Sequence, residues 1–211
     1  MKAITFFISM KGLTSIKLIT GLIIVNLCFG CACFPKKQET TQYLNKGNIN
    51  ALNGTYGIKP IYASQTVDST SMWYSERNLT SYSTLFKELD SRIIQKEIDI
   101  EEGKMYGMGL EILNEKIIKL KFIKEDSIVK QKRIGYRLKD DGYLYLKNNN
   151  FKMRGIPYLL GDFNKKRSRI TLNKENNLLF ETSEFSSGGL FFLKVYPIAK
   201  MKYEKVFERI E

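Results

Sequence analysis

The sequence has no histidine among its 211 residues, and it has only three cysteines, four prolines and one tryptophan. Without histidine, a Ser-His-Asp or Cys-His mechanism lacks its base, and zinc sites built on histidine are excluded. All three cysteines lie between positions 28 and 33, so the rest of the chain can form no disulfide and no cysteine-based zinc site. Stability must therefore come from core burial and strand pairing.

The same absences argue against enzyme activity. A carboxylate pair of the glycosidase type stays open, although no pair of Asp or Glu stands out. The glycines from Gly103 to Gly109 have no βαβ context, so they do not form a dinucleotide-binding fingerprint. We predict no enzyme activity, no cofactor and no metal.

The N-terminus has the layout of an export signal. Lys2, Lys11 and Lys17 carry the positive flank, and Leu18–Leu27 forms a short apolar core behind it. A transmembrane helix needs about 20 apolar residues, which is more than this run supplies before the cysteines. We therefore predict that residues 1–30 direct export of the chain.

The apolar run ends in a cluster of cysteines that resembles a bacterial lipobox. Gly30 is a small residue before Cys31, which makes Cys31 the first choice for cleavage and diacylglycerol attachment; Cys33, preceded by Ala32, is the second. An ordinary cleaved signal and an uncleaved N-terminal anchor stay open. Lipidation predicts attachment to the cell envelope, with the outer membrane as first choice and the leaflet left open.

The chain is strongly basic, with a formal net charge of +12. For an exported protein the relevant anions are lipid phosphates, lipopolysaccharide and acidic glycans, and we predict no nucleic-acid partner. The alternative, which we favour, is that the lysines solvate strand edges and turns. One basic stretch, Lys165-Lys166-Arg167 with Arg169, follows a turn and is interpreted either as a lipid-headgroup contact or as a solvated hairpin loop.

Behind the signal we expect a tether and one domain. Residues 31–51 are polar without apolar periodicity and predict a flexible spacer, and residues 52–211 predict the domain. Residues 62–80 predict an irregular connection. A short helix is expected over 83–90, because Phe86, Leu89 and Ile93 recur at helical spacing.

From about Ile94 the apolar pattern has a period of two, which is typical of β-strands. Short turns rich in Asn, Asp and Gly separate the runs, and pairing should break at Pro157. Strands at this spacing predict an all-β meander, which we interpret as an antiparallel up-and-down barrel of about eight strands with one short helix after the first strand. The expected strands after the helix are 104–113, 116–123, 127–138, 143–147, 151–156, 169–172, 178–182, 190–196 and 202–209.

Several segments resemble the lipocalin family. Leu52-Asn53-Gly54-Thr55-Tyr56 resembles its first-strand Gly-x-Trp motif, with tyrosine in place of tryptophan. The resemblance implies that Arg209, near the end of the last strand, packs over Tyr56 and closes the barrel. The helix over 83–90 and the hairpins from Asp141 to Pro157 are similar to those of small lipocalin-like bacterial lipoproteins.

Two functions follow as hypotheses. A barrel of about eight strands can hold a small apolar ligand, whose binding residues stay unknown. The alternative is a structural or accessory lipoprotein with a solid core, acting through protein or lipid contacts at surfaces such as Phe191-Phe192 and Tyr196-Pro197. The residues expected inside the barrel are Tyr106, Met108, Leu110, Ile112, Ile118, Leu120 and Phe122.

Overall fold

The computed structural model describes residues 34, 41–69, 84–89, 101–147, 150–156, 160–190 and 199–211. Within these ranges the chain forms nine strands and two short helical segments. The helical segments are the 3₁₀ turn η1 (Ile49–Leu52) and α2 (Leu85–Leu89). The strands are β1 (Gly54–Ser69), β2 (Tyr106–Asn114), β3 (Ile117–Lys124), β4 (Ser127–Leu138), β5 (Leu144–Lys147), β6 (Asn150–Ile156), β7 (Leu160–Leu172), β8 (Leu178–Leu190) and β9 (Ala199–Arg209).

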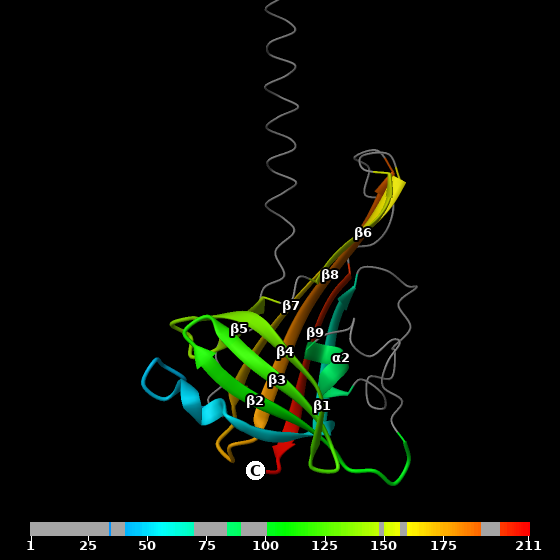
Figure 1. Ribbon diagram of the computed structural model, residues 1–211. Coiled ribbons are helices and arrows are strands. Elements are labelled where there is room, and N and C mark those ends of the chain that lie inside the picture. The colour runs from blue at the N-terminus through cyan, green and yellow to red at the C-terminus, as the bar shows by residue number, and fades with distance from the viewer. Residues whose placement is uncertain are drawn as a thin grey trace, which may run out of the picture. The chain divides into compact units, whose positions relative to one another are not determined.

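The sheet closes on itself as an antiparallel barrel (Figure 1). Strands β1 to β5 pair in sequence order, so that β4 with β5 is the last of these pairs. β5 then pairs with β7, β7 with β8, β8 with β9, and β9 with β1. Eight strands therefore form the ring, and β6 lies outside it, paired with the first half of β7. The predicted all-β antiparallel barrel is confirmed.

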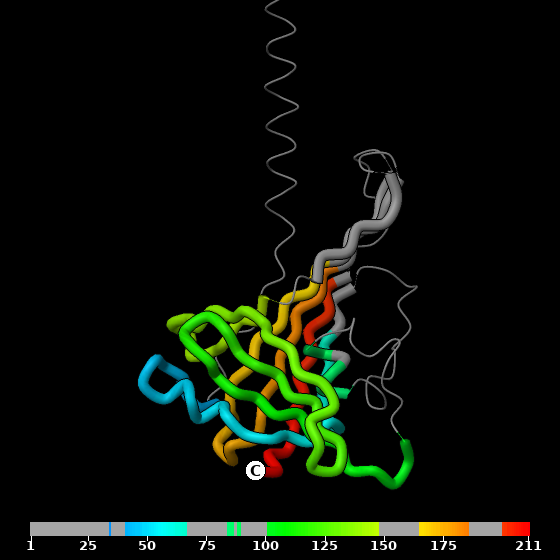
Figure 2. Tube along the Cα trace, in the orientation of Figure 1, coloured from blue at the N-terminus to red at the C-terminus, as the bar shows by residue number. Residues whose placement is uncertain are grey.

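The first and last strands lie side by side, as the cyan and red tubes of Figure 2 show. Their register runs from Tyr56 opposite Arg209 to Ser69 opposite Ala199. β1 therefore continues well into the stretch 62–80 that was expected to be irregular. The ladder between β1 and β9 closes the ring at one place, and the β5–β7 pairing closes it at the other.

The seam between β5 and β7 is short. Only two register pairs join these strands, Leu144 opposite Ile170 and Tyr145 opposite Arg169. The same edge of β7 has two partners: its first residues, from Leu160 to Lys166, pair with β6, and Arg169 and Ile170 pair with β5. β6 ends at Ile156, where Pro157 was expected to stop strand pairing.

Strands β7 and β8 are longer than their predicted cores of 169–172 and 178–182. They pair continuously from Leu160 opposite Leu190 to Leu172 opposite Leu178. The outer halves of both strands are rich in polar residues and glycine, so no apolar alternation marks them in the sequence. The backbone groups of these outer halves are satisfied by the pairing of β7 with β8, although the side-chain pattern does not predict strands there.

Helix makes up very little of the described chain. The helix expected over 83–90 is a single turn, α2, and Ile93 lies outside the described residues. η1, immediately before β1, was not predicted. A one-turn helix has no stability of its own, so α2 is held by the side chains that it buries against the barrel.

The interior has two different walls. Strands β2 to β4 line one with apolar side chains, and strands β7 to β9 line the other with apolar residues at one end and polar residues at the other. The six predicted interior residues that are buried in this core are Tyr106, Met108, Leu110, Ile118, Leu120 and Phe122. Ile112, the seventh, is partly buried against the core.

The second half of the predicted tether packs on the barrel. Thr41 forms a β-bridge with Asn173, and the amide of Gln42 donates to the carbonyl of Leu172 at 2.8 Å. Leu44 is buried, with 1% of its surface exposed. The prediction of a flexible spacer through residue 51 is therefore corrected from residue 41 onward, because these residues find backbone partners along the seam between β5 and β7.

Other predictions fall outside the described residues. They concern the signal 1–30, the two candidate lipidation sites Cys31 and Cys33, and the apolar candidates Phe191-Phe192 and Tyr196-Pro197. Their roles stay predictions.

Candidate ligand-binding site

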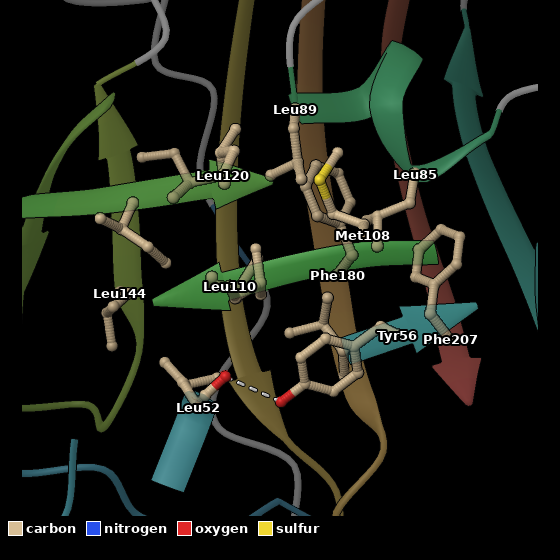
Figure 3. Close-up of a cluster of buried hydrophobic side chains, with 14 of the residues drawn as sticks. Leu52, Tyr56, Leu85, Leu89, Met108, Leu110, Leu120, Leu144, Phe180 and Phe207 are labelled. Atoms are coloured by element: carbon tan, nitrogen blue, oxygen red, sulfur yellow. Dashed lines mark hydrogen bonds between the residues drawn. The ribbon is translucent and has the colours of Figure 1, made fainter. Parts of the chain in front are cut away.

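The η1 end of the barrel is built around Tyr56. Its ring is fully buried, and its hydroxyl donates to the carbonyl of Leu52 at 2.9 Å, the hydrogen bond drawn in Figure 3. Leu52, the last residue of η1, is itself fully buried in the core. Burial raises the pKa of Tyr56 to about 12, against the opposing effect of Arg209, so the ring carries no charge.

Arg209 lies next to this ring. The centre of its guanidinium is 5.7 Å from the Tyr56 ring centroid, and the two residues are register partners on β1 and β9. The guanidinium also donates to the carbonyls of Ala51 at 3.1 Å and of Asn53. The structure thus brings together the pair that the lipocalin resemblance implied, with Arg209 also holding backbone carbonyls at the end of η1.

Gly54 makes this arrangement sterically accessible. A Cβ atom built on Gly54 would lie 2.6 Å from the carbonyl oxygen of Glu211 and 2.8 Å from a guanidinium nitrogen of Arg209. Because the first of these neighbours is backbone, a larger residue here would displace the chain end. The glycine of the Gly-x-Tyr pattern is therefore required by close approach.

A crevice of about 690 Å³ opens beside η1. Its apolar lining includes Ile49 on η1, Ile112 on β2 and Leu138 on β4, all of which pack against the core, and the more exposed Leu113. Tyr136 adds a buried ring whose hydroxyl donates to the carbonyl of Asn114 at 2.7 Å. The crevice therefore reaches the apolar interior face of the barrel wall.

The rim of this crevice is cationic. Lys46, Lys116, Arg137 and Lys147 line it and are exposed, and Glu115 is the single carboxylate among its lining residues. Glu115 pairs with Lys46 at 3.1 Å, but both side chains are more than 70% exposed, so this pair contributes little to stability. An apolar floor beneath a positive rim suits a ligand with an apolar chain and an anionic head group.

A second polar cluster lies inside the barrel, where α2 meets β7 and β9. The carboxylate of Glu88 contacts the ammonium groups of Lys166 and Lys205 at 2.8 Å each, and the hydroxyl of Tyr203 donates to it at 2.8 Å. Glu88 and Lys205 are buried, with 4% and no exposure. Burial would raise the pKa of Glu88, but the two lysines outweigh it and lower this pKa to about 2.

A third cluster lies on the outer face of β7 and β8. Arg169 pairs with Glu181 at 2.5 Å and with Asp141 at 3.2 Å, and its guanidinium stacks 3.8 Å from the centroid of the Tyr143 ring. Phe34 lies on the same guanidinium at 4.5 Å. Arg169 joins β7 to its seam neighbour through the hydroxyl of Tyr145, at 3.2 Å.

These positions correct the predicted basic tip. Arg169 is only 2% exposed, Lys166 is half-buried against Glu88, and both lie within β7. They form neither an exposed headgroup contact nor a solvated loop, because the strand continues through residues 160–172. Of the four basic residues in this stretch, Arg167 is the exposed one.

Glu88, Tyr203 and Lys205 were not among the residues predicted from the sequence. The signal was available on β9, where Tyr203 and Lys205 alternate with Phe207 and therefore share its inward face. Glu88 lies between Leu85 and Leu89 on α2, so it too falls on a buried surface. Among the described residues, no cluster of three or more potential metal ligands was found, and no helix is long and apolar enough to cross a membrane.

We expect Arg209→Ala to lower the free energy of unfolding by about 1–2 kcal/mol, because it removes the charged donor to the carbonyls of Ala51 and Asn53 at the end of η1. Urea denaturation of the full-length chain would measure this loss. Arg133→Ala is the matched control, since Arg133 is exposed on β4 and should change stability by less than about 0.5 kcal/mol. Equal losses in the two variants would contradict the closing role of Arg209.

We expect Glu88 to make stability depend on pH. Its pKa of about 2 in the folded chain lies below its ordinary value of 4.5, so its stabilising effect is full above about pH 4.5 and is lost as the pH falls through 2. The loss should reach roughly 3 kcal/mol and should be missing from Glu88→Gln. Unfolding free energies of both proteins between pH 2 and 6 would test this; parallel curves would refute it.

Comparisons of this chain with protein-family models, with curated proteins and with solved structures gave no match.

Proposed function

We propose that this protein is a lipid-anchored envelope lipoprotein whose lipocalin-like barrel binds a small amphiphile, with an apolar chain and an anionic head group, in the crevice beside η1. The observation that carries the proposal is the crevice itself. Its volume of about 690 Å³ falls in the range of small-molecule sites, roughly 300–1,000 Å³. Its chemistry is divided, with apolar residues at the floor and cations at the rim.

The division selects the ligand class. Ile49, Ile112 and Leu138 offer apolar surface to an alkyl chain, whose burial stabilises a complex by about 0.8 kcal/mol per methylene. The exposed lysines at the mouth attract an anion without being desolvated themselves. A neutral sugar or a cationic ligand would gain nothing from this rim.

The anchor rests on the sequence. A positive flank, a short apolar core and the cysteine after Gly30 support export and lipidation at Cys31, and the envelope is the location that follows. In the outer membrane, our first choice, an amphiphile-binding barrel would stand beside a bilayer that is itself a source of such ligands.

A specific observation favours the alternative of an accessory protein that acts through its surface. Met105, Ile128 and Val129 are more than half exposed near the β3–β4 turn, and the interior contacts of α2 leave a cavity of only about 20 Å³. Exposed apolar side chains of this size are typical of contact surfaces. A barrel that works this way should bind no amphiphile, so the titration below separates the two functions.

We expect the double variant Lys116→Glu/Lys147→Glu to bind laurate at least tenfold more weakly than the parent protein, since two of the four cationic rim residues change sign. The measurement is isothermal titration of the full-length chain in lipid nanodiscs, with empty nanodiscs as the blank. Lys59→Glu/Lys202→Glu is the matched control, because it makes the same charge change at exposed positions outside the crevice. No laurate binding by the parent protein would overturn the proposal in favour of the accessory function.

We also expect Cys31→Ser to abolish incorporation of labelled palmitate by a bacterial host, while Cys33→Ser keeps it. Only the cysteine that becomes the mature N-terminus can receive the acyl chains. Intact mass spectrometry of the membrane fraction would confirm the added lipid. Labelling that survives in Cys31→Ser but not in Cys33→Ser would move the anchor to Cys33, and a parent protein that takes up no label would exclude an acyl anchor.

A further inference from the structure

The cluster at Glu88 has the composition of a carboxylate-binding site. Two of its members, Lys166 and Lys205, are ammonium groups, and the third, Tyr203, donates a hydroxyl hydrogen. All three belong to the barrel wall, on β7 and β9, whereas the carboxylate that they bind comes from α2. The three donors to Glu88 therefore come from the wall, where Glu184 of β8 lies opposite Lys166, and the carboxylate that they bind comes from a separate element.

The wall beside these donors has one row that is polar on all three strands. Ser168, Thr182 and Tyr203 lie opposite one another on β7, β8 and β9, and the Ser168 and Thr182 hydroxyls are 3.2 Å apart. The next row holds Lys205 opposite Phe180, which faces Ile170. Polar and cationic side chains are costly inside a barrel unless an anion compensates them.

α2 itself has the chemistry of an amphiphile. Glu88 turns its carboxylate to the polar wall, while Phe86 and Leu89 contact the apolar wall of β2 and β3. The Phe86 and Phe122 rings are 4.0 Å apart. Figure 3 shows Leu85 and Leu89 pointing from α2 toward Met108 and Leu120. One turn of helix thus fills the space between the two walls with a charged end and an apolar end.

We propose that Lys166, Tyr203 and Lys205 form a carboxylate-binding site inside the barrel, that Glu88 occupies this site as an internal ligand, and that the carboxylate of a fatty acid replaces it. The alkyl chain then takes over the apolar contacts of α2 with β2 and β3. This site is separate from the crevice beside η1, because the two share no lining residue.

The exchange is feasible because α2 makes no ladder hydrogen bonds. A helix of five residues depends on docking for its structure, so its departure breaks no strand pairing. A covalently linked competitor acts at a high effective concentration, and weakening it should therefore raise the affinity of the site for an added ligand.

The test is isothermal titration of laurate into the full-length chain in nanodiscs, carried out in the Lys116→Glu/Lys147→Glu background so that the crevice contributes little. We expect Glu88→Gln to raise laurate affinity about tenfold or more, and Glu88→Asp to raise it less, because the shorter side chain retracts its carboxylate from the lysines. Adding Lys205→Met to Glu88→Gln should reverse the gain. Circular dichroism would establish that each variant is folded.

Matched ligands define the head group. Dodecanol has the same chain without the charge and should respond to none of these variants, whereas dodecyl phosphate separates a site for carboxylates from one for lipid phosphates. A gain for laurate alone supports the proposal as stated, and an equal gain for dodecyl phosphate would overturn its restriction to carboxylates. Should reversal of the crevice charges leave laurate binding unchanged, the crevice fails as a site, but the response to Glu88→Gln still decides this one.

Hydrogen exchange provides an independent measurement on the protein with its natural Glu88. Laurate should speed exchange at the amides of Leu85–Leu89, because α2 leaves the wall when the fatty acid binds. If Glu88 only fastens α2 to the barrel, Glu88→Gln will leave laurate affinity unchanged and laurate will not alter exchange in α2. That pair of results would overturn the proposal.

Discussion

The barrel depends on the closure of its sheet between β5 and β7, where two register pairs carry the whole ladder. So short a ladder is reinforced from outside. Arg169 contacts the Tyr145 hydroxyl across the seam and pairs with Asp141 on the turn before β5. The Thr171 hydroxyl donates to the carbonyls of Gln42 and Gly142. Side-chain hydrogen bonds and an ion pair thus replace ladder bonds that a four-residue strand cannot supply.

The same closure explains why residues 41–44 are packed. The amide of Gln42 donates to Leu172 at the end of β7, and the amide of Leu44 donates to Gly142 before β5, so this segment crosses the seam. Gly142 has a φ of +80°, and a Cβ there would lie 2.9 Å from the Tyr43 ring, so only glycine lets the segment approach. A stretch that is polar in sequence is therefore part of the barrel wall.

Period-two alternation predicted the barrel because strands β2 to β5 have one apolar face and one polar face. This alternation does not identify buried positions that carry polar or charged side chains. Lys205 and Arg169 are charged residues on buried faces. The partner of Lys205, Glu88, lies 117 positions away, and the partner of Arg169, Glu181, lies opposite it only through the register of β7 and β8. Pairings of this kind depend on tertiary register, which composition does not determine. The crevice was missed for the same reason, since Lys46 and Lys147 meet only after the chain has folded.

Tyr56 and Arg209 were predictable as a pair only through the resemblance to lipocalins. Their contact has a consequence for how the barrel is assembled. Arg209 also donates a hydrogen bond to Ala51, which lies 158 positions earlier in the chain. β1 pairs with β9 along one edge and with β2 along the other. During synthesis β1 can pair with β2 as soon as β2 has been made, but the other edge of β1 stays unpaired until β9 has been made. Contacts of such long range slow folding and leave an unpaired edge exposed in the meantime. Because of this strand order, the edge of β1 that is left unpaired is covered only when β9 pairs with it, and the curved sheet can close only then.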